Sequence, residues 1–423
     1  MIIIHRMSER HYRPRALTAA VQGALETHPV VVVTGGRQTG KTTLVRDLVR
    51  SKARDFVTLD DLDALELAQK RPADLLARAS RLTIDEIQRA PELLLSIKKD
   101  VDRRRRRGRF LLTGSANLHL MRGVADSLAG RAVYLLLSPF TGGEKRGDGT
   151  VPPWSEILQL RNPDALLEWC GERSHPAVDW RQEILRGGMP RSVLARTARE
   201  RFAWFDGFVR TYLERDLREL SQVASLPDFR RLMELAVHRV GQLVNQTELG
   251  RDAGLSQATA HRYLNLLETT YQTHRLPAYS VNPSKRLIKA PKIYWRDTGL
   301  AAHLVGLSHK RQLRSSPLAG PLLENSVLSA MTTWSETHPS RPNLFFWRTA
   351  GGAEVDFVIE QSRRLLPVEV KSSKRVRLAD VKPLETFLAD YGERAPFGIV
   401  LHDSSQPHRL TRRIVALPVV AFL

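Results

Sequence analysis

Cysteine is nearly absent from this chain of 423 residues, which holds Cys170 alone. A single thiol excludes a disulfide framework within the chain and any zinc site built from several cysteines, so a reducing cytoplasm is the expected compartment. Long apolar runs are missing as well. Without about 18 consecutive apolar residues, the sequence predicts no membrane-spanning helix. The apolar start at residues 1–4 is too short for a secretion signal.

Acidic residues are also in short supply. The chain has 45 Asp and Glu against 65 Lys and Arg, which gives a formal net charge of +20. Such an excess favours polyanionic partners, most often nucleic acid, although a basic surface can also be merely solvated. The hydrophobic content of 42% is typical of a globular chain and excludes a disordered one.

A glycine-rich loop between an apolar run and a helical pattern is the strongest signal. The apolar run covers residues 30–33. The loop and the first helical residues are Gly35, Gly36, Arg37, Gln38, Thr39, Gly40, Lys41, Thr42 and Thr43. The glycines let backbone N–H groups turn toward a phosphate, and the helix N-terminus adds partial positive charge. We expect Lys41 to reach the β- and γ-phosphates of ATP and Thr42 to hold Mg²⁺.

Apolar runs alternate with helical patterns as far as residue 140. The expected strands are 30–34, 56–60, 82–85, 110–114 and 132–136. This alternation predicts an α/β fold whose parallel sheet is covered by helices on both faces. The strand at 82–85 ends in two acids. Asp85 would orient Mg²⁺, and Glu86 would activate the water that attacks the γ-phosphate.

Three further side chains are catalytic candidates. Ser115 and Asn117 follow the strand at 110–114, where they would touch the γ-phosphate or position water, unless they only form a turn. Arg131 would stabilise the charge that develops on the transferred phosphate, supplied from the same or a neighbouring subunit. The alternative for Arg131 is a surface arginine in a basic chain.

Together these motifs resemble a widespread bacterial and archaeal family of AAA+ type ATP-binding proteins. The matching segments are 35–44, 84–88, 112–115, 127–131 and 212–217. The resemblance covers nearly the whole chain and implies a P-loop NTPase core that uses ATP and Mg²⁺. It also implies a C-terminal domain of uncharacterised function and makes a homo-oligomeric ring an expectation. Gly36 departs from the proline of the family pattern, a change that leaves phosphate binding intact.

Changes in residue composition and in hydrophobic pattern along the chain predict its domain organisation. A turn-rich stretch at 141–149 is expected to be a linker or an exposed loop, and a basic one at 306–317 a second linker. Residues 202–220 are expected to form one long amphipathic helix. The expected domains are an ATPase core at 1–145, a helical lid or linker region at 146–240, a winged helix-turn-helix at 241–310 and a restriction-endonuclease-like α/β domain at 311–423.

Two short helical patterns, at 246–253 and 257–268, predict the helix-turn-helix, with Ser256 as the N-cap of the second helix. A hairpin over 273–295 would form a basic wing. The candidate nucleic-acid contacts are Gln257, Thr259 and Arg262 on the second helix and Lys285 and Arg286 in the wing. The expected partner is DNA, read in the major groove. The alternative is a module that packs against its own chain or another subunit.

Acidic residues and a lysine near the C-terminus resemble the site of the PD-(D/E)xK nuclease fold. Glu369 and Lys371 share one face of a strand, Asp356 lies on the preceding strand, and Glu324 lies near the start of a helix. Here the three carboxylates would form a second Mg²⁺ site, and Lys371 would orient the attacking water. The alternatives are a non-cleaving relative of that fold and simple cross-strand charge pairing.

The sequence therefore predicts an ATPase that hydrolyses ATP to drive or gate DNA binding. Two alternatives remain open, an ATP-regulated, Mg²⁺-dependent DNA nuclease and an ATP-dependent scaffold that recruits a protein partner.

Overall fold

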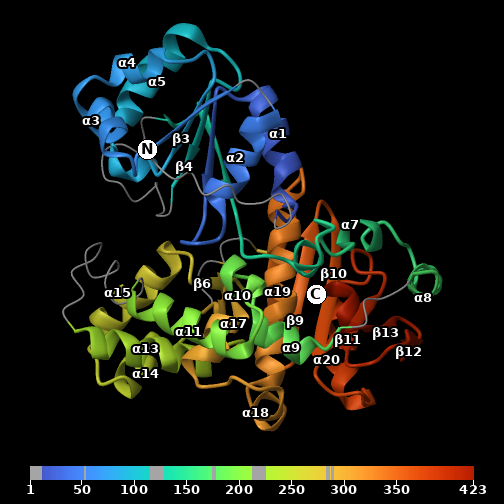
Figure 1. Cartoon of the computed structure of the whole chain (residues 1–423). Helices are drawn as coiled ribbons and strands as arrows, with labels where there is room; N and C mark the ends of the chain where they lie inside the picture. The colour runs from blue at the N-terminus through green and yellow to red at the C-terminus, as the bar shows by residue number, and fades with distance from the viewer. Residues whose placement is uncertain are drawn as a thin grey trace.

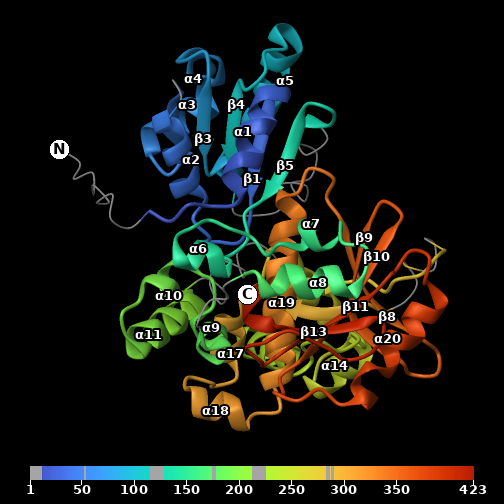
Figure 2. The same ribbon diagram turned by 90° about the vertical axis from the view of Figure 1, so that its right-hand side faces the viewer.

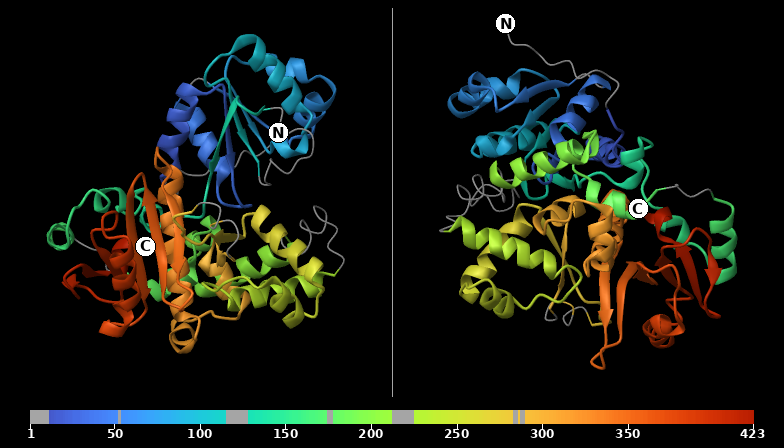
Figure 3. Two further views of the ribbon diagram at one scale, coloured as in Figure 1. Left: turned by 180° about the vertical axis from the view of Figure 1, so that it is seen from behind. Right: turned by 60° about the horizontal axis from the view of Figure 1, so that its bottom comes forward.

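The computed structural model describes residues 12–51, 54–114, 128–173, 178–211, 225–282, 286 and 290–423. Figure 1 shows an N-terminal α/β layer, coloured blue to cyan, above two regions that pack side by side. One region consists mainly of green and yellow helices, and the other holds an orange and red sheet. The long helix α19, Ala319–Thr337, stands between the two, and Figure 3 shows the same arrangement from behind.

The N-terminal layer is built on a five-stranded sheet with strand order β2-β3-β4-β1-β5. Its strands are β1 Val30–Thr34, β2 Asp55–Thr58, β3 Leu82–Asp85, β4 Phe110–Thr113 and β5 Ala132–Leu136. Every neighbouring pair is parallel. The predicted parallel sheet is therefore confirmed, and β1, β3 and β5 have the predicted bounds.

Helices cover both faces of this sheet. On one face lie α1 Leu17–Thr27 and α2 Lys41–Ser51, and on the other lie α3 Leu62–Lys70, α4 Pro72–Ala77 and α5 Leu93–Arg104. Alternate residues of β1 enter the two cores: Val31 and Val33 face the first pair of helices, while Val30 and Val32 face the other three. Burial on both sides explains why β1 is an unbroken apolar run.

The linker predicted at 141–149 is wrong, because helix α6, Gly142–Arg146, lies within it. Thr141 Oγ1 accepts a hydrogen bond from the backbone N–H of Glu144 at 3.2 Å, and the Glu144 carboxylate accepts one from Thr141 N at 2.9 Å. This capping box fixes the helix start despite the two glycines. The linker predicted at 306–317 likewise contains helix α18, Lys310–Ser315.

The middle of the chain is helical, as predicted. Its helices are α7 Trp154–Ile157, α8 Pro163–Gly171, α9 Trp180–Arg186, α10 Pro190–Leu194, α11 Ala198–Phe208 and α13 Leu226–His238. Of the long helix predicted at 202–220, α11 forms the beginning, and residues 212–220 lie outside the described residues. Trp180 and Phe229 from these helices share one apolar core with Leu322 of α19 and Phe357 of the C-terminal sheet. The two regions below the N-terminal layer in Figure 1, here called the lower half of the molecule, therefore pack as one body.

The two short helices predicted after residue 245 are α14, Gln246–Asp252, and α15, Gln257–Thr269. Ser256 is the N-cap of α15, and its hydroxyl accepts a hydrogen bond from Thr259 N at 3.2 Å. A two-stranded antiparallel sheet follows, formed by β6 Thr273–Leu276 and β7 Lys292–Trp295. Helix α17, Thr298–Leu304, comes next.

The C-terminal region contains a six-stranded mixed sheet of order β12-β13-β11-β10-β9-β8 (Figure 2). The strands are β8 Asn343–Arg348, β9 Glu354–Gln361, β10 Arg364–Lys371, β11 Gly398–His402, β12 His408–Arg409 and β13 Ile414–Pro418. Helix α19 packs on one face and α20, Leu378–Asp390, on the other. A short 3-10 helix, η6 Val419–Phe422, ends the chain.

Asn325 of α19 joins the C-terminal region to β7. Its side chain is fully buried, accepts a hydrogen bond from Trp295 N at 2.7 Å and donates one to Trp295 O at 2.6 Å. Because both backbone groups are inside the core, they have no water to replace this amide.

We expect Asn325→Ala to lower the free energy of unfolding by about 2–3 kcal/mol, because it leaves a buried donor and a buried acceptor without partners. Urea denaturation of the full chain measures this. Asn343→Ala, at an exposed position of β8, is the matched control and should change stability by less than about 0.5 kcal/mol. Equal stability of the two variants would contradict the role of Asn325.

Candidate functional site

The phosphate loop connects β1 to α2 and adopts backbone conformations that demand glycine. Gly35 and Gly40 have φ values of 144° and 97°. A Cβ at Gly35 would lie 2.5 Å from the carbonyl oxygen of Leu137, closer than any side chain could tolerate. Thr39 is buried and its hydroxyl donates to Gly36 O at 2.9 Å, while Arg37, Gln38 and Thr43 are exposed.

Lys41 points back over this loop. Its Nζ donates hydrogen bonds to the carbonyl oxygens of Gly35 at 3.0 Å and Gly36 at 2.8 Å. Burial lowers the pKa of Lys41 to about 8, against the attraction of Glu86 and Asp85, which raises it. The ammonium is thus held where the turn of the loop would present a phosphate.

Asp85 lies beside the start of α2, at the end of β3. One carboxylate oxygen accepts a hydrogen bond from Thr42 Oγ1 at 2.9 Å, and Thr58 Oγ1 lies 3.5 Å from the same oxygen. Thr113 Oγ1 from β4 donates to the other oxygen. Carboxylate and hydroxyl oxygens are the hard ligands that Mg²⁺ prefers, so these residues fit the metal that accompanies ATP. Thr42 and Asp85 would hold it.

Glu86 has a left-handed backbone, with φ 56° and ψ 46°, at the start of the short 3-10 helix η2, Ile87–Arg89. Its backbone N–H donates to Thr113 Oγ1 at 3.2 Å, and its carboxylate accepts from the side chain of Gln88. A non-glycine residue in this conformation costs energy and is common at functional sites. This conformation turns the chain at Glu86 away from the direction of β3, which ends at Asp85.

Arg15 is a residue of this site that the sequence analysis missed. Its guanidinium donates to Thr39 O at 2.8 Å, pairs with Glu144 at 2.9 Å and lies 4.6 Å from the ring centre of Phe140. Both charged side chains are buried. The capping-box spacing of Thr141 and Glu144 was the available signal, because a buried glutamate requires a cationic partner.

Arg131 lies at the other end of the sheet from the phosphate loop. It directly precedes Ala132, which pairs with Val30 at the start of β1, whereas the loop follows Thr34. Five residues of strand span roughly 16 Å. Arg131 instead pairs with Asp102, with 3.1 Å between Nη2 and Oδ2. Action on the phosphates of its own chain does not fit this distance, and a role in a neighbouring subunit stays a prediction.

Several other candidates are placed differently. Ser115, Asn117 and Lys285 lie outside the described residues. On α15, Gln257 and Arg262 are exposed, as a nucleic-acid contact requires. Thr259 is half-buried, and its hydroxyl accepts a hydrogen bond from Ser256 Oγ at 3.0 Å, which makes it part of the helix cap.

The prediction that Arg286 belongs to a free basic wing is wrong. After β6 the chain crosses to the C-terminal sheet, where Tyr279 N donates to Phe346 O at 2.6 Å. Arg286 packs over the ring of Tyr279 and forms a two-pronged pair with Glu360 of β9, at 2.9 and 3.1 Å. A guanidinium committed to a carboxylate and a ring presents no free charge to a phosphate.

The structure brings Glu324, Asp356, Glu369 and Lys371 together. Asp356 Oδ2 accepts from Val370 N at 2.9 Å, and Glu369 Oε2 accepts from Asp356 N at 3.3 Å. Glu369 Oε1 lies 2.7 Å from Lys371 Nζ. Burial, together with the charge of Asp356, raises the pKa of Glu324 and of Glu369 above the usual value.

A second lysine, missed in the sequence, lies inside this acidic cluster. Lys292 of β7 is 1% exposed. Its Nζ lies 2.7 Å from Glu354 Oε1, 3.4 Å from Glu324 Oε1 and 3.8 Å from Asp356 Oδ1. Burial lowers the pKa of Lys292, but attraction to these carboxylates outweighs burial and holds the pKa above its usual value. Lys292 is therefore charged.

The second Mg²⁺ site predicted from Glu324, Asp356 and Glu369 is not supported. Within the described residues, no group of three or more His, Cys, Asp or Glu side chains could hold a metal ion. The physical reason is that an ammonium already faces Glu324 and Asp356. These carboxylate oxygens do not converge on a space for a metal.

An AAA domain matches residues 27–145. Two domains of unknown function match 177–311 (DUF8612) and 319–422 (DUF4143). The uncharacterized protein Rv2008c of Mycobacterium tuberculosis (strain ATCC 25618 / H37Rv) is 34% identical over 359 residues, which are 84% of this chain and 73% of that protein. The values for Mb2031c of Mycobacterium bovis (strain ATCC BAA-935 / AF2122/97) are the same.

The chain belongs to the family of these mycobacterial proteins. It is an ATPase of the AAA type, with a C-terminal domain of unknown function. Among solved structures, the Walker-type ATPase PABY2304 of Pyrococcus abyssi is similar, with 16% identity, 69% of this chain and 98% of that chain covered, and a TM-score of 0.42. AMPPCP-bound DnaA from Aquifex aeolicus aligns with 14% identity, 59% and 86% coverage, and a TM-score of 0.29.

Among the described residues, none of the ATPase's helices has the length and apolar character that crossing a membrane requires.

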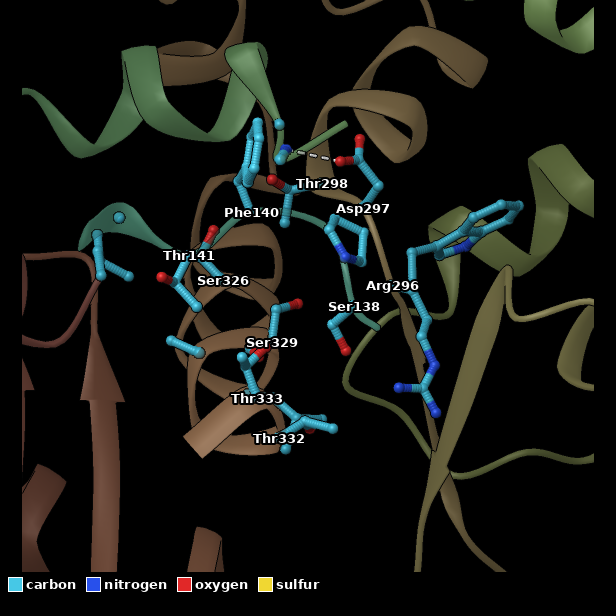
Figure 4. A pocket seen from close by; sticks show the side chains of 18 of the residues that line it. Ser138, Phe140, Thr141, Arg296, Asp297, Thr298, Ser326, Ser329, Thr332 and Thr333 are labelled. Atoms are coloured by element: carbon cyan, nitrogen blue, oxygen red, sulfur yellow. Dashed lines mark hydrogen bonds between the residues drawn. The ribbon is translucent and has the colours of Figure 1, made fainter. Parts of the chain in front are cut away.

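A pocket of the ATPase lies where its regions meet (Figure 4). The serine and threonine residues that line it are Ser138, Thr141, Thr298, Ser326, Ser329, Thr332 and Thr333. Asp297 also lines it and accepts a hydrogen bond from Gly188 N at 2.6 Å. The pocket therefore joins the loop after β5, the segment after β7 and helix α19, and it is separate from the phosphate loop.

The position of Lys41 predicts how ATP affinity depends on pH. The free ATPase loses the Lys41 proton near pH 8, whereas bound phosphates favour the charged form. Affinity for Mg²⁺·ATP should be constant up to about pH 7.5 and fall roughly tenfold by pH 9, because binding must then take up a proton. Equilibrium titration with a fluorescent ATP analogue measures this.

Lys41→Arg is the control, because arginine keeps its charge over the whole range and should give a flat profile. A flat profile between pH 7 and 9.5 for the unmodified chain would contradict the lowered pKa of Lys41.

Proposed function

We propose that this AAA-type ATPase uses ATP binding and hydrolysis at the phosphate loop to control the binding of DNA by the α14–α15 helix pair. ATP binding rests on the loop, Lys41, Thr42 and Asp85, with Glu86 as the residue that activates water. The winged-helix character of the α14–α15 pair and DNA as its partner are proposals.

The observation that carries this proposal is the close approach of the phosphate loop to the segment that follows α15. A Cβ at Gly36 would lie 3.6 Å from the carbonyl oxygen of Tyr271 and 3.8 Å from its Cβ. Tyr271 is the second residue after α15, and its N–H donates to Glu268 O at 3.0 Å. It has a left-handed backbone with φ 59°, a conformation that costs energy for a bulky residue. Its side chain is hydrogen-bonded with that of Thr34 at the end of β1.

This approach would bring the C-terminal end of the proposed DNA-binding helix close to a nucleotide bound at the loop. A bound phosphate would have to reposition Lys41, which now bonds Gly35 and Gly36. A shift of Gly36 presses on Tyr271 and so on the C-terminal end of α15, whose N-terminal half presents Gln257 and Arg262. Strained residues such as Tyr271 are common in segments that change conformation when a ligand binds.

Charge supports DNA as the partner. The formal net charge of +20 attracts polyanions, and Arg251 and Arg262 are exposed on α14 and α15. Binding of this kind releases counterions, so it should weaken steeply with salt. A protein partner would instead leave turnover indifferent to DNA. Assembly into a homo-oligomer is also proposed, because Arg131 could reach phosphates only in a neighbouring subunit.

Turnover of ATP at low salt with Mg²⁺, with and without duplex DNA, tests this proposal. We expect DNA to raise turnover several-fold and Lys41→Ala to reduce it to background. Arg262→Ala should weaken DNA binding by about 1–3 kcal/mol, if this residue contacts a base or a phosphate. Arg412→Ala, at an exposed position of the C-terminal region, is the matched control. If ATP turnover is the same with and without DNA at every salt concentration, the DNA proposal is rejected, whereas the assignment of ATPase activity is unaffected.

Tyr271 provides a separate test of the coupling. Tyr271→Gly tolerates the left-handed backbone but removes the side chain, whose Cβ lies next to Gly36 of the loop. We expect this variant to bind DNA while losing most of the stimulation of turnover. Tyr271→Phe keeps the ring and should retain most of it. If the glycine variant is stimulated as strongly as the unmodified chain, the signal does not pass through Tyr271.

A further inference from the structure

Lys292 occupies the centre of the acidic cluster of the C-terminal region. It comes from β7, the second strand of the sheet that follows α15, and reaches across to α19 and β9. The three carboxylates nearest to its Nζ belong to Glu354 at 2.7 Å, Glu324 at 3.4 Å and Asp356 at 3.8 Å. The Lys292 side chain is 2% exposed, so water has little access to its charged group.

Other groups of the same chain also contact the carboxylates around Lys292. Tyr294 OH, also on β7, donates to Glu324, and Arg348 lies 3.3 Å from Glu354 Oε2. Asp356 accepts from the backbone of Val370, as described above. A divalent metal requires several of these oxygens to converge on one point, and here they face a hydroxyl, a backbone N–H and cationic side chains of the same chain.

The chemistry of the nuclease-like residue pattern therefore does not fit this arrangement. In that chemistry, carboxylates on neighbouring strands hold a metal that activates water. Here the cation beside the carboxylates is an ammonium, which does not coordinate water as a metal ion does. The distances place it against Glu324 and Asp356, two of the three residues that the pattern assigns to the metal.

We propose that Lys292 is the resident cation of this acidic cluster and that the cluster clasps β7 to the C-terminal region instead of cutting nucleic acid. The proposal is independent of DNA binding by α15. A buried lysine with buried carboxylates is stable only while both partners stay in place. The contacts between Lys292 and the carboxylates therefore fix the position of β7 against α19 and β9. They also fix the position of the α14–α15 helix pair, which precedes this sheet in the chain.

Binding of Mn²⁺ to the nucleotide-free full chain, followed by electron paramagnetic resonance, tests this directly. The chains compared are the unmodified one, Asp356→Asn, Lys292→Met and Lys292→Met combined with Asp356→Asn. Lys145→Met is the matched control, because Lys145 pairs with Glu183 at 2.6 Å at a less buried position. Thermal unfolding of each chain is recorded in parallel.

We expect the unmodified chain to show no Mn²⁺ site that Asp356→Asn removes. Lys292→Met should gain such a site, because it leaves the carboxylates without their cation, and the double variant should lose it. The Tm of Lys292→Met should fall by more than about 5 °C relative to Lys145→Met, with part of the loss restored in the double variant.

Two results would overturn the proposal. The first is a Mn²⁺ site in the unmodified chain that Asp356→Asn abolishes, which would make the metal the true occupant. The second is a Lys292→Met chain that is as stable as Lys145→Met and gains no Mn²⁺ site. If Lys292→Met alone fails to fold, the comparison of the unmodified chain with Asp356→Asn still decides the first point.

Discussion

The buried positive charge of Lys292 is the constraint on which the lower half of the molecule depends. An ammonium at 1% exposure is tolerated only beside carboxylates, and these come from α19 and β9. Strand β7 must therefore lie against both elements. Asn325 ties the far end of the same strand to α19 through two hydrogen bonds with Trp295. A strand held at both ends gives the α14–α15 pair a rigid foundation.

The nucleotide site is built against that foundation. Arg15 and Glu144 brace the phosphate loop from the ATPase side, and Tyr271 touches it at Gly36 from the side of α15. Because the lower half shares one apolar core, a displacement of the loop cannot be absorbed by loose packing there. We therefore propose that such a displacement moves the helix pair as a unit and that ATP in this way controls what the pair binds.

The features that the sequence predicted are those encoded locally. The phosphate loop, Asp85 and the parallel sheet follow from short motifs and from apolar runs buried on both faces. Most of the errors concern contacts between residues far apart in the chain, and one concerns a local capping box. No neighbouring residue in the sequence indicates that Lys292 and Arg286 have carboxylate partners on β9. The two glycines after Thr141 favoured a loop, although Thr141 and Glu144 form a capping box. Charged residues were read as free surface groups or metal ligands because their partners are set by tertiary packing.

The central claim is that ATP at the loop and DNA at the helix pair are thermodynamically coupled. The most direct measurement is the Kd for duplex DNA of the Glu86→Gln chain, which should keep ATP intact, with and without saturating Mg²⁺·ATP. The reciprocal measurement gives the Kd for ATP with and without DNA. Linkage requires the same factor in both directions, and the account predicts a factor of at least about five. DNA affinity that is unchanged by ATP would contradict it.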